Sequence, residues 1–223
     1  GGAHRIDQPT LPVDEPYTTS ATGMGVKAYV VDTGIDAAHS EFGGRVVNGY
    51  DAVGDGRGGM DCNGHGTHVA GTVGGATSGV AKDASLVNVR VLNCEGRGTW
   101  AGILAGFDWV AKDAERSGGP AVLNASLGGD RSTSVDTAVE AVADAGVLPV
   151  VAAGNDNRDA CDVSPAGSRG CCRNGGRSLN SLQLSDGTTQ NRPQRMQKLV
   201  FPGCGHRAAP STRPAPRPKI GEL

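Results

Sequence analysis

The sequence predicts an α/β fold in which a parallel β-sheet carries helices on both faces, followed by an irregular C-terminal segment. Over residues 1–166, short runs of β-branched and apolar residues alternate with stretches whose apolar residues recur at helical spacing. After Ala166 both periodicities stop, and near the end of the chain prolines alternate with arginines, which prevents regular packed structure. We therefore expect a folded part, residues 1–166, and a basic, Pro- and Arg-rich tail, residues 167–223, that is poorly ordered.

Four strands are expected in the folded part, each an apolar run bounded by turn-forming residues. They cover residues 26–31, 84–92, 121–123 and 147–153. The first strand ends at Asp32-Thr33-Gly34 and the last at Gly154-Asn155, which are typical turn sequences. The carboxyl ends of parallel strands meet at one edge of a sheet, so binding and catalytic groups are expected there.

Two helices are expected between the later strands. In the first, apolar residues fall on one face at spacings i, i+4, i+7 and i+11: Ile103, Phe107, Val110 and Ala114. The second carries a similar stripe made of Val135, Ala138, Val139, Val142 and Ala143. Thr133 and Asp136 have capping-box spacing at its start, and Gly146 follows its end. The apolar run after His65 indicates the beginning of a further, buried helix.

Composition limits the class of protein. The chain has 223 residues, of which 37% are hydrophobic, which is enough for the core of one large or two small domains and excludes wholesale disorder. No uncharged apolar run approaches the roughly 18 residues of a membrane span. The chain begins with Gly1 rather than Met, so we expect a processed or partial product. A dinucleotide-binding turn is excluded, because Gly23-Met24-Gly25 precedes the first strand instead of following it.

Charge is divided unevenly along the chain. The tail has eight Arg and two Lys against Asp186 and Glu222, a net charge of +8, whereas residues 1–166 have a net charge of −10. Two interpretations stay open. The first is an acidic body with a basic tail that binds a partner, and the second is a tail that is translated out of frame.

Three polar residues stand out at strand ends or among small residues. Asp32 follows the first strand, His65 lies in the segment Asn63–Gly71, and Asn155 follows the last strand. Singly, each has an ordinary explanation, because Asp and Asn are common turn residues and a lone His is commonly structural. His65 and His68 also have the spacing of a metal pair, but neither an HExxH nor a paired-Cys pattern supplies a third ligand.

Taken together, an Asp, a His and a strand-end Asn in this order on a parallel α/β sheet resemble the subtilisin-like serine proteases. Three segments are similar in sequence to motifs of that family: Val31–Asp36, His65–Gly71 and Ser126–Gly129. Arg5–Gln8 is similar to the proteinase K and aqualysin type. The resemblance covers about residues 4–166, so it implies the N-terminal part of a subtilisin-like catalytic domain, with the fold incomplete.

The resemblance implies a role for each of these residues. His65 would be the general base, Asp32 would orient its imidazole, and Asn155 would donate a hydrogen bond to the oxyanion of the tetrahedral intermediate. An extended peptide substrate would bind as an added strand. The residues expected to bind it are Gly96, Gly98, Ser126, Leu127, Gly128, Ala153 and Gly154.

Six cysteines indicate disulfides in a secreted protein, although the sequence does not determine their pairing. They are Cys62, Cys94, Cys161, Cys171, Cys172 and Cys204. The resemblance implies a bond between Cys62 and Cys94. It places the usual partner of Cys161 in a stretch that this chain does not show.

A structural calcium site is a further implication of the resemblance, while no cofactor is expected for the chemistry itself. Asp7, Gln8 and Asp14 lie in a Pro-rich turn where aqualysin-like proteins bind Ca²⁺ through oxygen ligands. His4 and Pro16 stand where further oxygen ligands are expected. A solvated acidic turn is therefore an equal alternative.

The nucleophile that the resemblance requires is absent. The family places it in a Gly-Thr-Ser-Met-Ala segment, and no such segment follows Asn155. A frameshift explains the loss. Codons permitted for Ser168–Arg177 encode Val-Ala-Ala-Ala-Ala-Val-Thr-Val-Gly-Ala when they are read one nucleotide later. This is an apolar strand that ends in a sequence typical of the family. The same hypothesis accounts for the arginines, adjacent cysteines and lost periodicity of the tail.

These inferences predict a secreted, monomeric serine endopeptidase that hydrolyses proteins or peptides by an Asp-His-Ser mechanism and is inactive as written. Neither nucleic acid nor a membrane is expected as a partner. The alternative is a non-catalytic, subtilase-like module that binds peptides and carries a basic tail. The Arg-Pro alternation of that tail is compatible with polyproline II structure and with anionic surfaces.

Overall fold

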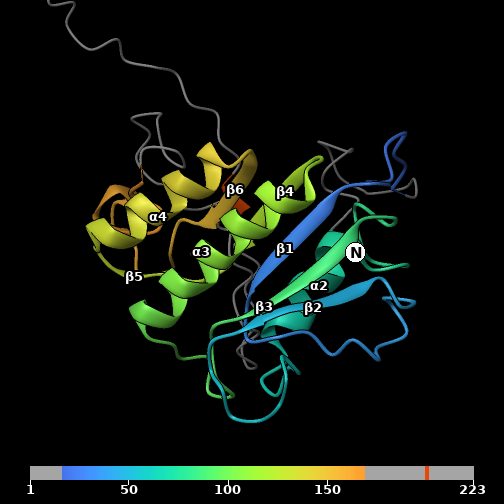
Figure 1. Ribbon diagram of the computed structural model, residues 1–223, viewed down its shortest axis with the longest axis horizontal. Coiled ribbons are helices and arrows are strands. Elements are labelled where there is room, and N and C mark those ends of the chain that lie inside the picture. Colours follow the sequence, from blue (N-terminus) through green and yellow to red (C-terminus); the bar gives the residue numbers. More distant parts are fainter. Residues whose placement is uncertain (1–16, 169–198, 201–223) are drawn as a thin grey trace, which may run out of the picture.

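A six-stranded sheet runs through the computed structural model, which describes residues 17–168 and 199–200 (Figure 1). In spatial order the strands are β2 (Val46–Asp51), β3 (Ser85–Arg90), β1 (Lys27–Asp32), β4 (Ala121–Ala125), β6 (Val147–Ala152) and β8 (Leu199–Val200). The first five are parallel, and β8 pairs antiparallel with β6. The predicted parallel sheet and its four strands are confirmed.

The sequence does not predict β2 or β8. Asn48-Gly49 interrupts the apolar run of β2, and the register with β3 shifts at this point. Gly49 is needed there, because an added Cβ would lie 2.6 Å from the ring of Trp109. β8 has only two residues and falls in the tail expected to be irregular, where no period is long enough to indicate a strand.

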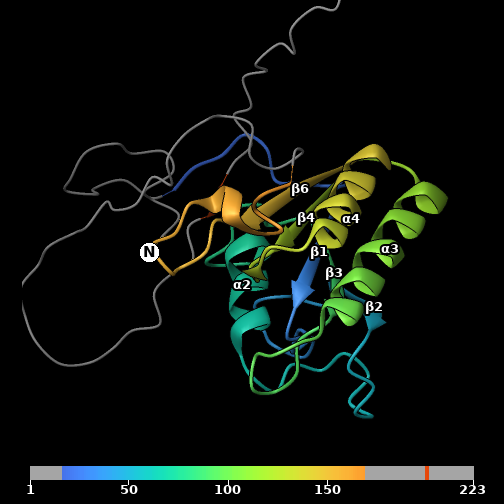
Figure 2. The same cartoon turned by 90° about the vertical axis from the view of Figure 1, so that its left-hand side faces the viewer.

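Within residues 17–168, three helices cover the two faces of the sheet (Figure 2). They are α2 (His65–Gly74), α3 (Trp100–Ser117) and α4 (Thr133–Asp144). Val30 of β1 packs with Ala70 of α2, whereas Val31 belongs to the cluster that includes Phe107 of α3 and Val139 of α4. Because successive side chains of a strand point to opposite faces, α2 covers one face, and α3 with α4 covers the other.

The start of α4 differs from the predicted capping box. Ser132 is the N-cap, one residue earlier than expected. In a capping box, the side chain three residues after the N-cap accepts from the N-cap N–H, and here that residue is Val135. The carboxylate of Asp136 instead accepts a 2.7 Å hydrogen bond from Oγ of Ser164. Ser164 belongs to β7 (Val163–Ser164), which follows a 3₁₀ turn, η1 (Ala160–Asp162), and pairs with β5 (Gly129–Asp130).

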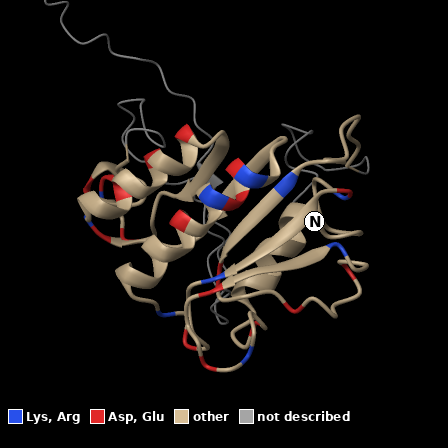
Figure 3. Ribbon diagram, viewed as in Figure 1, with Lys and Arg blue, Asp and Glu red and all other residues tan. Residues whose placement is uncertain are grey.

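Charged groups of both signs are spread over the face shown in Figure 3. Acidic residues lie on α3, α4 and the loops beyond β2 and β3, with isolated Lys and Arg residues between them. The basic, Pro- and Arg-rich tail, residues 167–223, lies almost entirely outside the described residues. Within the described part, no helix is both long and apolar enough to cross a membrane.

Candidate active site

Asp32 and His65 form a hydrogen-bonded pair where β1 ends and α2 begins. Oδ1 of Asp32 lies 2.7 Å from Nδ1 of His65. The side chain of Asp32 is fully buried, whereas that of His65 is 28% exposed. Asp32 is buried because β1 lies between β3 and β4. The structure therefore brings together two of the sequence-predicted residues, with the carboxylate inside and the imidazole reaching the surface.

The environment of His65 favours its charged form. The hydrogen bond that His65 donates to Asp32 is the main reason that the pKa of His65 lies above its ordinary value, and burial opposes this effect. The negative charges of Asp32 and Asp61 add to the increase in pKa. Such a pair binds a proton on the imidazole more readily than an isolated histidine does.

Glycines on either side of His65 allow α2 to start against the end of β1. Gly64 is the N-cap and has φ 97°, a left-handed conformation that most side chains disfavour. Gly66 lies so close to β1 that an added Cβ would be 2.1 Å from the carbonyl oxygen of Gly34. The Gly-His-Gly sequence therefore permits the short distance between His65 and Asp32.

A cleft of about 650 Å³ has His65 in its wall. It also contains five of the predicted substrate-binding residues, on two separate chain segments: Gly96, Gly98, Ser126, Leu127 and Gly128. The first segment follows β3 and the second follows β4, so the carboxyl ends of neighbouring parallel elements build the cleft.

Ala153, Gly154 and Asn155 follow β6 and are not among the residues that line this cleft. Asn155 is exposed. The structure thus brings the predicted acid-base pair together with two of the predicted substrate-binding segments, whereas these three predicted residues lie outside the lining of the cleft.

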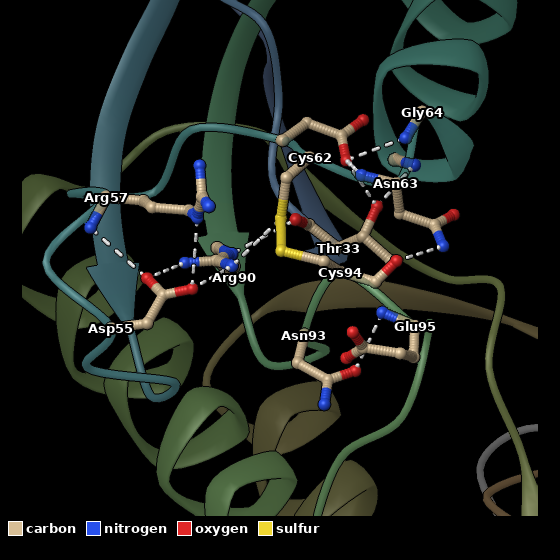
Figure 4. The surroundings of a disulfide bond; sticks show 12 residues. Thr33, Asp55, Arg57, Cys62, Asn63, Gly64, Arg90, Asn93, Cys94 and Glu95 are labelled. Carbon is tan, nitrogen blue, oxygen red and sulfur yellow. Dashed lines mark hydrogen bonds and ion pairs between the residues drawn. A yellow bond between two sulfur atoms is a disulfide. The ribbon is translucent and has the colours of Figure 1, made fainter.

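The disulfide that the resemblance implied is present between Cys62 and Cys94 (Figure 4). It joins the loop before α2 to the loop that contains Gly96 and Gly98. Beside it, the Nδ2 amide of Asn63 donates a 2.8 Å hydrogen bond to the carbonyl oxygen of Cys94. These two links fix the His65 side of the cleft to its neighbouring wall.

The buried guanidinium of Arg90 lies next to this disulfide (Figure 4). It contacts Asp55 through two nitrogens, at 2.6 and 2.8 Å, and its Nε donates to the carbonyl oxygen of Thr33. Asp55 lies close to both bonded sulfurs, but a disulfide has no thiolate to offer a metal ion. This cluster is therefore a structural support of the site.

Arg90, Thr33 and Asp61 were not singled out by the sequence. Arg90 ends a buried strand, and its burial depends on acidic partners at the end of β2 and in the loop that follows it. Asp61 precedes His65 by four residues, and an Asp before a helix start is a capping signal that the sequence does carry. For Thr33 the sequence predicts only a place in the turn after the first strand.

Several predicted residues lie outside the described part of the chain. They are the candidate calcium ligands Asp7, Gln8 and Asp14 and the cysteines Cys171, Cys172 and Cys204. Cys161 is a free, exposed cysteine among the described residues. The calcium site and the pairing of the later cysteines therefore stay predictions.

The sequence of residues 23–207 matches the Subtilase family. The chain belongs to this family. Together with the sheet and helices described above, the match confirms the family resemblance and the subtilisin-like α/β fold.

Among curated proteins, the subtilase is 59% identical over 165 residues to "Extracellular serine proteinase" of Thermus sp. (strain Rt41A), which covers 74% of this chain and 40% of the relative. It is 54% identical over 165 residues to "Alkaline serine exoprotease A" of Vibrio alginolyticus, covering 74% of this chain and 30% of the relative. The chain therefore spans less than half the length of these relatives.

A solved structure described as a cold-adapted subtilisin-like serine proteinase is similar to the subtilase, with a TM-score of 0.70 and 53% sequence identity. The match covers 74% of this chain and 59% of that chain. About two-fifths of the solved domain therefore has no counterpart in the match.

Proposed function

We propose that this subtilase chain is the N-terminal part of the catalytic domain of a secreted serine endopeptidase that hydrolyses peptide bonds in proteins. The observation that carries the proposal is the 2.7 Å contact between buried Asp32 and His65, in the wall of a cleft. A carboxylate that binds Nδ1–H of an imidazole leaves Nε2 as the basic nitrogen, which is the arrangement that general-base catalysis requires.

His65 would remove the proton from a serine hydroxyl and later deliver it to the leaving amine. Asp32 would keep the imidazole in the correct tautomer and stabilise the imidazolium, without taking the proton itself. The raised pKa of His65 supports this division of roles. The side-chain amide of Asn155 would donate to the oxyanion of the tetrahedral intermediate, an interaction worth roughly 3–4 kcal/mol in such sites.

Substrate recognition is proposed to use the two segments that line the cleft. An extended peptide would lie between Gly96–Gly98 and Ser126–Gly128 and hydrogen-bond to their backbones, as in β-strand addition. Ala153 and Gly154 would extend this surface toward Asn155. The substrate class is thus a protein or peptide in extended conformation.

The chain as written is expected to be inactive, because no Gly-Thr-Ser-Met-Ala segment supplies the nucleophile. The test is to continue the coding sequence in the alternative reading frame and express the resulting domain. Hydrolysis of a chromogenic peptide, blocked by a serine-directed inhibitor, is the expected result. Asp32→Asn and His65→Ala variants should lower kcat by several orders of magnitude.

Two outcomes would overturn the proposal. One is a restored domain that folds, carries the serine and still fails to cleave any peptide. The other is cleavage by chain 1–223 itself that survives His65→Ala, since this would place the chemistry elsewhere.

A second candidate is a non-catalytic module that binds peptides and carries a basic tail. The observation in its favour is that the cleft and both of the segments proposed to bind peptide are present in a chain without the nucleophile. Calorimetric binding of an uncleaved extended peptide to chain 1–223 would support it. Salt-sensitive binding of residues 167–223 alone to DNA would extend it to an anionic partner.

The remaining proposals concern setting and stability. The names of the two bacterial relatives support secretion, and the domain is proposed to act as a monomer. Structural Ca²⁺ is proposed at Asp7, Gln8 and Asp14, whose oxygens suit a hard cation. Addition of a calcium chelator should then lower the unfolding temperature of the restored domain, and Asp14→Asn should remove that sensitivity.

A further inference from the structure

One carboxylate, that of Asp61, accepts five hydrogen bonds at the start of α2. Its Oδ1 accepts from the hydroxyl of Thr33 and from the backbone N–H groups of Asn63 and Gly64, each at 2.9 Å. Its Oδ2 accepts from the backbone N–H of Thr67 at 3.0 Å and from the hydroxyl of Thr67 at 2.6 Å. Both oxygens are therefore engaged: Oδ1 by the strand end and the segment before the helix, and Oδ2 by the first turn of the helix.

These contacts bind the end of β1 to the first turn of α2. Thr33 directly follows Asp32, and its hydroxyl oxygen also accepts a 2.9 Å hydrogen bond from the backbone N–H of Gly66. Thr67 lies in the first turn of the helix that His65 begins. Asp61 is thus connected to the chain segments on both sides of the Asp32–His65 contact.

Asp61 also replaces a conventional helix cap. The N-cap residue, Gly64, has no side chain and makes no capping bond. The N–H groups at a helix start need acceptors, and these are normally supplied by the N-cap side chain. Here Asp61, three positions before the N-cap, accepts from the N–H of Thr67, and an anion at this end of the helix is also favoured by the helix dipole. The N–H groups of His65 and Gly66 donate instead to side-chain oxygens of Asn63 and Thr33.

We propose that Asp61 is a positioning residue for the Asp32–His65 pair. It holds the strand end that carries Asp32 against the helix start that carries His65, and its negative charge favours the protonated imidazole. The proposal rests on the proposed function for its catalytic meaning, but the positioning itself is a property of the folded chain.

Few charged groups surround the imidazole. Asp32 faces it from β1, Asp61 lies before α2, and Glu95 and Arg97 line the same cleft. Burial opposes ionisation of Asp61, but the hydrogen bonds from Thr67, Gly64 and Asn63 keep its pKa below the ordinary value. Asp61 is therefore an anion at every pH at which His65 titrates.

The test is to titrate the His65 imidazole of purified chain 1–223 by NMR and to follow the downfield proton shared by Nδ1 and Asp32. Asp61→Asn removes one charge. The proton-binding constant of His65 is expected to fall roughly threefold to tenfold, and the downfield resonance to broaden or vanish. Asp36→Asn is the matched control: Asp36 bonds to Thr67 through its backbone N–H, which the substitution keeps, and its carboxylate accepts from the N–H of Ala38. It should leave both signals unchanged.

A purely structural role would give a different result. If Asp61→Asn lowers the unfolding temperature but leaves the titration and the shared proton unchanged, the proposal is wrong. If that variant does not fold, Thr67→Val and Thr67→Ser replace it. Thr67→Val should shift the His65 titration in the same direction as Asp61→Asn. Thr67→Ser keeps the hydroxyl donor and should leave the titration unchanged. Equal titrations in the two variants would overturn the proposal.

None of these measurements needs a nucleophile. An inactive restored domain would therefore contradict the proposed function and leave the positioning role of Asp61 standing. An unchanged His65 titration would contradict the positioning role of Asp61 and leave the proposed function standing.

Discussion

Arg90 places a full positive charge inside the protein, with a side chain that is 0% exposed. The charge is matched by Asp55 at 2.6 Å and Asp51 at 3.3 Å. Breaking a buried ion pair on one side is strongly destabilising, because the remaining charge loses its partner. Since Arg90 also binds the carbonyl oxygen of Thr33, this charge cluster stabilises the turn directly after Asp32.

Asp55 gives this cluster a predictable acid sensitivity. The hydrogen bonds from Arg90 are the main cause that lowers the pKa of Asp55 to about 2. A carboxyl whose pKa is depressed on folding stabilises the protein above its unfolded pKa of roughly 3.9 and loses this effect as the pH falls toward the folded value. Asp55→Asn should therefore lower the urea midpoint at pH 6, and the difference from wild type should shrink between pH 4 and pH 2. A constant difference over this range would contradict the prediction.

His65 should give the opposite pH dependence. Its pKa is raised on folding, so its pairing with Asp32 stabilises the protein fully below the unfolded pKa of about 6.5. The stabilisation is lost as the pH rises through the folded pKa. The unfolding temperature of His65→Gln should therefore lie furthest below that of the wild type near pH 5 and approach it at alkaline pH. Parallel curves from pH 5 to pH 9 would contradict this assignment.

Single residues differ in how well the sequence reveals them. Asp32 and His65 stand in short segments with small neighbours, so their juxtaposition at a strand end and a helix start could be predicted. Arg90 could not, because its burial depends on Asp51 and Asp55, which come from a different strand and loop. From sequence alone, a charged residue is predicted to lie at the surface, because the partners that would allow its burial are not known.

At the scale of elements, α2 is fitted closely to β1 on one side only. An added Cβ at Gly66 would meet the carbonyl oxygen of Gly34 at 2.1 Å, whereas at Gly71 it would meet none of the described residues within 4 Å. Gly66→Ala should therefore destabilise the fold by about 1–3 kcal/mol through overpacking. Gly71→Ala is the matched control and should be neutral or stabilising by up to about 1 kcal/mol, because Ala favours a helix. Chemical denaturation measures both, and equal losses would contradict the asymmetry.

Elements with a sustained period were predicted correctly. The four strands of residues 26–153 and the helices α3 and α4 follow from apolar runs and from the stripe of Phe107 and Val110. β2 was missed because Gly49 breaks its apolar run, and Gly49 is required by a tertiary contact with Trp109. The start of α4 was misplaced by one residue, since the choice between Ser132 and Thr133 depends on local backbone geometry.

At the scale of the whole molecule, one face of the sheet is only partly covered by the described residues. Leu148 of β6 is 48% exposed, and it pairs in register with Val122 of β4 on the face that α2 covers further along. Chain 1–223 is therefore expected to aggregate once it is thermally unfolded, so that its unfolding transition is not recovered on a second scan. Calorimetry with a repeat scan measures this. A cooperative transition that recovers fully on the second scan would contradict it.

The reading frame can be tested at the same scale. DNA sequencing across codons 160–180 should give codons for residues 168–177 that encode the apolar strand one nucleotide later. A natural codon set that cannot yield that strand would exclude the frameshift. The tail would then be a genuine segment of the protein, and its net charge of +8 would need a partner.

The place of β1 in the sheet has a consequence for the order of events during synthesis. Among the described strands, β1 is the first to leave the ribosome, but its two neighbours are β3, beginning at Ser85, and β4, beginning at Ala121. Until both have been made, β1 has unpaired edges and Asp32 remains hydrated. The nascent chain must therefore carry an exposed, Val-rich strand through the synthesis of nearly a hundred residues, which favours slow folding and protection by a chaperone.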